Sequence, residues 1–309
     1  MTAPVVFIVF NRPEVTARVF AAIRSAQPSK LLVVCDGPRR QKAGEAEKVQ
    51  AVRAIVERGV DWPCEVRTNY SEANLGCRHR VASGITWAFE QVEEAIILED
   101  DCLPDPSFFP FCTELLARYR HDQRVLHING TNLAPARSPG RHGYRFSHYP
   151  WIWGWATWRR AWAHFDFTMQ HWEEREAVMR GTFASAWEAQ YWIAEWNRAR
   201  KDLERANTWG FPWMFSVRAQ GGLTLMPTTN LVRNLGMGDD ATHTRNALQH
   251  LDFSTAEVNR LGFAPKRCVN RYQDEYFTRR YANAPRGIGA DLRSHLRVWR
   301  YQKQLRAAP

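Results

Sequence analysis

Hydrophobic and polar positions along the first 130 residues follow the pattern of an α/β domain. Short apolar stretches, typical of strands covered on both faces, are separated by longer amphipathic stretches. Strands are predicted at 5–10, 31–35, 64–68, 95–98 and 125–128. Helices are predicted between them, at about 13–26, 48–57, 77–92 and 108–119. Strands that alternate with helices of this length indicate βαβ units and a mostly parallel sheet.

Aromatic residues become dense in the second half of the chain. Eleven of the 14 tryptophans lie between 151 and 213, and the segment 151–158 is expected to form a distinct layer over the sheet. Leu292, Leu296 and Trp299 share one stripe of a predicted last helix, with arginines around it. The elements predicted in this half are helices at 185–206, 211–220 and 291–305, a strand at 223–226 and a loop at 230–244.

Composition narrows the class of protein. With 309 residues and 45% hydrophobic content, the chain can bury a sizeable core as one large α/β domain or two smaller ones. No apolar run reaches the roughly 18–20 residues that span a bilayer, and the run at 5–10 is too short for a signal peptide. A cytoplasmic protein is therefore expected. The six cysteines form no CxxC pair, which predicts reduced thiols rather than disulfides or a zinc site.

The net charge of +10 is unevenly distributed. Residues 251–309 carry 12 Lys and Arg against 5 Asp and Glu. A basic tail suggests an anionic partner, such as a lipid headgroup, nucleic acid or phosphorylated substrate. A solvated surface is the plainer alternative.

The predicted strand at 95–98 is followed by three consecutive carboxylates, Glu99, Asp100 and Asp101. Adjacent acids repel one another unless a cation or several hydrogen-bond donors lie among them. At the carboxyl end of a strand in an open α/β sheet, they would face the crevice where ligands bind. A divalent cation carrying a diphosphate would explain both the charge and the position. A polar turn is the alternative.

Other predicted elements bring polar residues to the same crevice. Asn11 and Arg12 follow the first strand, and Asp36 follows the second. An arginine can clamp a phosphate oxygen, and a carboxylate can accept from a base or ribose, although Asp36 also suits the first position of a turn. Arg78 and Arg80 begin the third predicted helix, where anions are favoured, and are a second candidate diphosphate contact. Plain surface positions are the alternative for both.

These segments resemble the GT-A glycosyltransferases, most closely the bacterial family 2-like sugar transferases related to the N-acetylglucosaminyltransferase I group. The resemblance covers about residues 4–245 and rests on ordered segments at 5–13, 35–37, 74–76, 96–101, 153–158 and 230–236. It implies a GT-A fold: a Rossmann-like, mostly parallel sheet flanked by helices, with a Trp-rich acceptor-side layer and a helical C-terminal extension. The domains it implies are a GT-A domain at 1–245, with a nucleotide-binding half at 1–130 and an acceptor-side half at 131–245, and a basic extension at 246–309.

The resemblance also implies a nucleotide-sugar donor and a divalent cation, Mn²⁺ or Mg²⁺. The acidic triplet becomes a DXD-like motif in which Asp101 is the direct metal ligand. Glu99 and Asp100 would hold the ribose and metal-bound waters, and Asp36 would contact the base. The cation would stabilise the departing nucleoside diphosphate as its negative charge develops.

An inverting transferase needs a general base near the acceptor hydroxyl. Related enzymes often place an Asp in the region that matches 209–213, but this stretch has no carboxylate. The base and the stereochemical outcome therefore stay open. The candidates are Asp166, which fits a helix flank better, Glu188, and the pair Asp239 and Asp240, which we predict for this role.

The resemblance raises two further sets of candidates. His243 could supply a late metal ligand or phosphate contact, as a C-terminal histidine does in some GT-A enzymes, or could be an uninvolved loop residue. Trp151, Trp153 and Trp209 are candidates to stack on an acceptor sugar. Core packing is the alternative for these tryptophans.

The sequence therefore predicts a metal-dependent glycosyltransferase that moves a sugar from a nucleotide-diphosphate donor to a saccharide or lipid-linked glycan acceptor, in cell-surface polysaccharide synthesis. A sugar-nucleotidyltransferase is an alternative, although it would normally have a Gly-rich loop where Asn11-Arg12-Pro13 stands. A non-enzymatic module that binds polyanions or a membrane surface is another. Nucleic acid is not expected as a partner, because the acidic crevice would repel phosphates without a metal. Asp291–Leu305 is the candidate for peripheral contact with the inner face of the membrane, with packing on its own domain or a dimer contact as the alternative.

Overall fold

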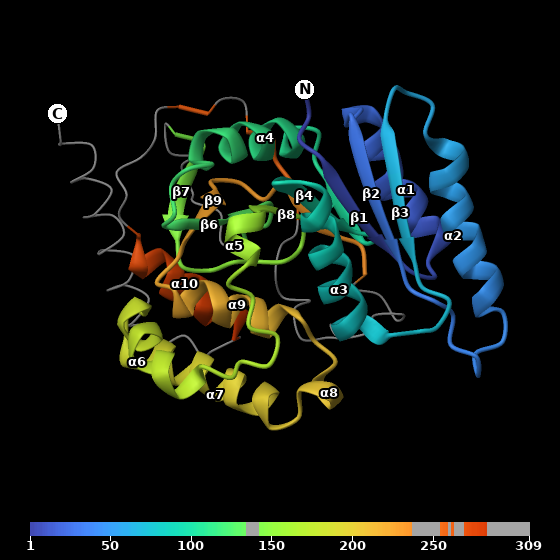
Figure 1. Cartoon of the computed structure of the whole chain (residues 1–309). Coiled ribbons are helices and arrows are strands. Elements are labelled where there is room, and N and C mark those ends of the chain that lie inside the picture. The colour runs from blue at the N-terminus through green and yellow to red at the C-terminus, as the bar shows by residue number, and fades with distance from the viewer. Residues whose placement is uncertain (134–141, 237–253, 259–260, 263–268, 283–309) are drawn as a thin grey trace.

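An eight-stranded sheet organises the part of the chain that the structure describes (Figure 1). The computed structural model describes residues 1–133, 142–236, 254–258, 261–262 and 269–282. The strands of the sheet are β1 (Val5–Val9), β2 (Lys30–Cys35), β3 (Glu65–Tyr70), β4 (Glu94–Glu99), β6 (Val125–Asn129), β7 (Tyr144–Ser147), β8 (Trp155–Trp158) and β9 (Leu223–Pro227). Their order is β3-β2-β1-β4-β8-β6-β9-β7. Strands β8 and β7 run antiparallel to their neighbours, and the other pairings are parallel.

The first half of the sheet follows the sequence pattern, and the predicted mostly parallel α/β sheet flanked by helices is confirmed. Every residue of β1 is buried, as a continuous apolar run requires. Strand β3 lies at the sheet edge and exposes residues 65–68, which explains why it has no apolar run. In Figure 1, α2 and α3 lie on opposite sides of this part of the sheet. The connecting helices are α1 (Pro13–Ala26), α2 (Glu45–Gly59), α3 (Gly76–Gln91) and α4 (Phe108–Tyr119).

The tryptophan-dense segment is not a layer over the sheet at residues 155–158, and this expectation was wrong. These four residues form β8, which lies inside the sheet between β4 and β6. Trp155 stacks on Trp209, with ring centroids 5.8 Å apart, whereas Trp158 donates from Nε1 to the Leu116 carbonyl of α4 at 3.2 Å. The two rings therefore cover opposite faces of the sheet, because strand positions three residues apart point to opposite faces.

A Trp-rich layer does exist, and other segments build it. Trp151, Trp172, Trp192 and Trp196 belong to a second hydrophobic cluster that is separate from the main core. The predicted helix at 185–206 divides at Asp202, whose side chain accepts from the Arg205 N–H at 2.9 Å. The helices of this half are α5 (Arg159–Trp162), α6 (Trp172–Thr182), α7 (Ala186–Lys201), α8 (Leu203–Ala206), α9 (Gly210–Ala219) and α10 (Arg271–Tyr281).

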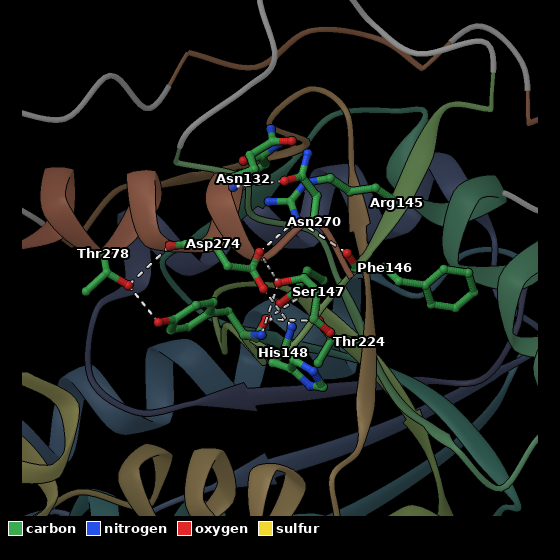
Figure 2. Close-up of polar contacts among 12 residues, drawn as sticks. Asn132, Arg145, Phe146, Ser147, His148, Thr224, Asn270, Asp274 and Thr278 are labelled. Carbon is green, nitrogen blue, oxygen red and sulfur yellow. Dashed lines mark hydrogen bonds and ion pairs between the residues drawn. The ribbon is translucent and has the colours of Figure 1, made fainter. Parts of the chain in front are cut away.

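Helix α10 is fixed to the edge strand β7 by one carboxylate, although more than a hundred residues separate them in the chain (Figure 2). Arg145 Nη1 and Ser147 Oγ each donate to Asp274 Oδ1 at 2.8 Å. The backbone N–H of His148 donates to Asp274 Oδ2 at 3.0 Å. Because Asp274, Ser147 and His148 are buried and Arg145 is only partly exposed, this network holds the second cluster against the sheet.

The predicted loop at 230–244 begins with a strand, so the expectation was wrong for its first residues. Strand β10 (Val232–Asn234) pairs antiparallel with β5 (Cys102–Pro104), directly after the acidic triplet. The rest of that loop beyond 236 and the predicted helix at 291–305 lie outside the described residues. The five cysteines in the described ranges are free thiols. None of the helices in those ranges combines the length and apolarity needed to cross a membrane.

Candidate functional site

The carboxyl ends of β1 and β4 bring Arg12 onto the acidic triplet. Arg12 Nε donates to Asp100 Oδ2 at 3.4 Å, and Nη2 donates to Asp100 Oδ1. The same Nη2 donates to Asp101 Oδ2 at 3.0 Å. Strands β1 and β4 are parallel neighbours, so residues that follow them meet at one edge of the sheet, as the sequence predicted.

The cluster carries more negative than positive charge. Burial, together with the charges of Asp101 and Asp100, raises the pKa of Glu99 to about 8. Burial also raises the pKa of Asp100 to about 6, against the opposing effect of Arg12. Although burial opposes it, the charges of Asp100 and Asp101 raise the pKa of Arg12. A second cation would therefore be favoured here, because one guanidinium faces three carboxyl groups.

The segment after β10 lies directly against this cluster. The Leu235 N–H donates to the Asp101 carbonyl at 2.7 Å, and the Gly236 N–H donates to Asn234 Oδ1 at 2.7 Å. A Cβ on Gly236 would lie 2.9 Å from Arg12 Nη1 and 3.1 Å from Asp101 Cγ. The resemblance includes Gly236 only as the end of the segment 230–236, and the structure places this residue directly against Arg12 and Asp101.

Asn11 leads to a second pairing at the same edge. Its Nδ2 donates to Glu45 Oε1 at 2.9 Å. Arg39 also donates to Glu45, from its backbone N–H at 2.7 Å and from Nε at 3.0 Å. These hydrogen bonds, chiefly those from the Arg39 side chain, lower the pKa of the buried Glu45 to about 2. Arg39 is half-exposed and was missed from sequence, although the basic residues that follow Asp36-Gly37 were a signal for it.

The carboxylate of Asp36 already accepts hydrogen bonds from other groups of the protein. Its carboxylate accepts from the backbone N–H groups of Gly37 at 2.9 Å, Leu75 at 2.9 Å and Gly76 at 3.0 Å. Asn74 Nδ2 adds a fourth bond at 3.0 Å. Burial nevertheless raises the pKa of Asp36. The residue before helix α3 provides no side-chain cap, so Asp36, directly after β2, accepts from the first N–H groups of the helix. The predicted contact with a base stays a prediction.

Arg78 and Arg80 are buried inside the protein, which argues against the predicted diphosphate contact. Arg78 donates to Glu204 Oε1 at 3.1 Å and to the Phe167 carbonyl at 3.1 Å. Arg80 donates to the Cys35 carbonyl at 3.2 Å and to Asn69 Oδ1 at 2.8 Å. The carboxylate of Asp36 already accepts from the N–H groups at the start of α3, where an anion would bind. The guanidinium groups of Arg78 and Arg80 instead hydrogen-bond to neighbouring segments of the protein.

The acceptor-stacking prediction is wrong for two of the three tryptophans. Trp151 and Trp209 are 6% and 2% exposed, so neither ring has a face for a sugar. Trp151 packs on Phe277 with centroids 4.6 Å apart, and Trp209 stacks on β8. Trp153 is half-buried between the two hydrophobic clusters and stays a candidate.

The described candidates for the general base have structural roles. Glu188 is buried, and Thr278 Oγ1 and the Ala184 N–H donate to it at 3.0 and 2.8 Å. Asp166 shapes a turn by accepting from the His171 N–H at 3.2 Å. The predicted residues Asp239, Asp240 and His243 lie outside the described residues.

The oxygen ligands at the cluster fit a cation for which the protein supplies only some of the ligands. Among the described residues, no three His, Cys, Asp or Glu side chains are grouped so as to hold a metal ion by themselves. Asp101 is partly exposed, and its Oδ1 accepts only from the Cys102 thiol at 3.4 Å in the described structure. Mg²⁺ typically takes one or two carboxylates and completes its shell with water and substrate phosphates. Asp101 and Asp100 can supply such a partial set of oxygen ligands.

Comparisons with known proteins give little beyond this geometry. No protein-family model matches the chain, and no curated protein matches it significantly. Among matching solved structures, 4-diphosphocytidyl-2C-methyl-D-erythritol synthase from Anaerococcus prevotii is 10% identical, with a TM-score of 0.32 over 56% of this chain and 84% of that chain. UDP-glucose pyrophosphorylase complexed with UDP-glucose is 10% identical, with a TM-score of 0.34 over 72% of this chain and 90% of that chain. Likeness at this level carries no argument, so the resemblance to GT-A glycosyltransferases stays a prediction.

Proposed function

We propose that the chain is a metal-dependent glycosyltransferase that uses a nucleotide-diphosphate sugar as donor and a saccharide or lipid-linked glycan as acceptor. The observation that carries the proposal is the grouping of Glu99, Asp100 and Asp101 with Arg12 at the carboxyl edge of a mostly parallel sheet. Ligands of open α/β sheets bind at this edge.

The chemistry of these side chains suits a diphosphate leaving group. Asp101 and Asp100 offer oxygen ligands to Mn²⁺ or Mg²⁺, which would neutralise charge as the nucleoside diphosphate departs. Arg12 presents a planar fork of donors that matches phosphate oxygens. Asn11 follows the same strand as Arg12, and Arg39 lies beyond the end of the neighbouring strand β2. Both donate to Glu45 and are further candidates to contact the donor.

The test is isothermal titration of nucleoside diphosphates and nucleotide sugars, with Mn²⁺ and with EDTA. We expect binding that requires the cation and that Asp101→Asn abolishes. Asp61→Asn is the matched control, because Asp61 is a half-exposed carboxylate that also pairs with an arginine of α1. Cation-independent binding, or equal binding by Asp101→Asn, would contradict the proposal.

Product analysis separates the proposal from the alternative activity. A glycosyltransferase releases a nucleoside diphosphate from the nucleotide sugar, slowly to water and faster with an acceptor. A sugar-nucleotidyltransferase instead releases pyrophosphate from a nucleoside triphosphate and a sugar phosphate. Pyrophosphate release that depends on Asp101 would replace the proposed activity with the alternative one.

A further inference from the structure

Arg12 lies between Asp100 and Asp101, where a cation can pair with both carboxylates. Its Nη2 donates to both Asp100 and Asp101, and its Nε makes a second contact with Asp100. Among the described residues, no other Lys, Arg or His pairs with either acid. The side chain is 29% exposed, so this ion pair is neither sealed in the core nor free in solvent.

The position of Arg12 is confined on its other side. Gly236 packs so closely that a Cβ there would lie 2.9 Å from Arg12 Nη1. The Leu235 N–H holds this segment on the carbonyl of Asp101 at 2.7 Å. The guanidinium is therefore built into the cluster between the acids and the segment after β10.

A divalent cation and this guanidinium cannot both bind the aspartates at full strength. Two positive charges within a few ångströms repel, and the repulsion is strong where protein excludes water. Each also needs the carboxylate oxygens that the other uses. An anion placed beside them, such as a diphosphate, removes the conflict because it offers oxygens to both.

We propose that Arg12 is a resident counter-ion of Asp100 and Asp101, which competes with the divalent cation in the free protein and transfers its donors to the phosphate oxygens when the donor binds. This inference rests on the proposed function and adds a regulation of the same site. Cation and nucleotide then bind cooperatively, because each makes the release of Arg12 less costly for the other.

The test measures Mn²⁺ binding by electron paramagnetic resonance, in wild type and in Arg12→Met, with and without a nucleoside diphosphate. Without nucleotide, we expect Arg12→Met to bind Mn²⁺ at least tenfold more tightly than wild type. With nucleotide, the gain in Mn²⁺ affinity should be at least tenfold smaller in Arg12→Met than in wild type. Arg24→Met is the matched control, since Arg24 pairs with Asp61 on the surface at the other end of α1, and it should behave as wild type.

The outcomes separate this inference from the proposed function. Equal or weaker Mn²⁺ binding by Arg12→Met without nucleotide overturns the counter-ion role, while nucleotide-dependent binding by wild type would leave the proposed function standing. No Mn²⁺ binding by wild type, even with nucleotide, overturns both. If Arg12→Met does not fold, Arg12→Lys keeps the charge but cannot bridge both acids in the same way. It should show a smaller gain in Mn²⁺ affinity, and no gain would again overturn the role.

Discussion

Replacing Asp36 by Ala tests whether this carboxylate supports α3 rather than a ligand. Three backbone N–H groups lose their acceptor in the variant, whereas Asn74 Nδ2 loses Asp36 but keeps the Gly37 carbonyl at 2.8 Å. Loss of a helix cap costs about 1 kcal/mol, and a buried donor left unsatisfied costs about 1–3 kcal/mol. Leu75 is 44% exposed, so water can replace its partner, whereas the buried Gly37 has less access to solvent. We therefore expect the free energy of unfolding to fall by about 3 kcal/mol.

Urea unfolding followed by tryptophan fluorescence measures this loss. Asp61→Ala, at an exposed site, is the control and should leave the free energy of unfolding close to that of wild type. A loss below about 1 kcal/mol in Asp36→Ala would refute the capping argument, because it is the cost of one solvated cap. If nucleotide binding vanished while stability stayed at that level, the base contact predicted from sequence would be the better account.

Three other perturbations follow from the structure. Gly236→Ala should weaken cation-dependent nucleotide binding in calorimetry, with little change in the denaturant midpoint, because the new methyl group would intrude on Asp101. Trp209→Ala should lower the free energy of unfolding by about 3–5 kcal/mol in urea, since the ring is core rather than sugar-binding surface. The raised pKa values of Glu99 and Asp100, about 8 and about 6, mean that the folded state holds protons which the unfolded chain has released. The free energy of unfolding in EDTA should therefore fall as pH rises from about 4.5 through about 8, and Mn²⁺ should reduce that fall. A free energy of unfolding that stays flat or rises over this range would contradict the raised pKa values of Glu99 and Asp100.

Much of the fold could be predicted because burial on both faces produces a readable sequence signal. Strands β1, β2 and β4 appear as continuous apolar runs, and the helices between them have the expected length. Strand β8 was missed as a strand because tryptophans on both faces give the same dense run as a layer over the sheet. Strands β5 and β10 have three residues each, too few for any periodicity, and their pairing joins residues far apart in the chain.

The site, too, could be predicted from the sequence only in part. Arg12, Asp100 and Asp101 could be placed together because each follows a strand, and parallel neighbouring strands end at one edge. The partners of Arg78 could not be foreseen, since Phe167 and Glu204 reach it from distant segments. The burial of Trp151 likewise depends on Phe277, which a local pattern does not reveal.

The place of β6 in the sheet has a consequence for how the polypeptide acquires its structure. Strand β6 ends at Asn129, yet its hydrogen-bonded neighbours are β8 and β9, and β9 begins only at Leu223. During synthesis, β6 therefore emerges with both edges unpaired. The edge that pairs with β9 stays unpaired until α5 to α9 have been made. Closing so long a loop is entropically costly and slow. A fragment that ends at residue 130 should accordingly not fold on its own. We expect the nascent chain to depend most on chaperones after β6 and before β9 have been made.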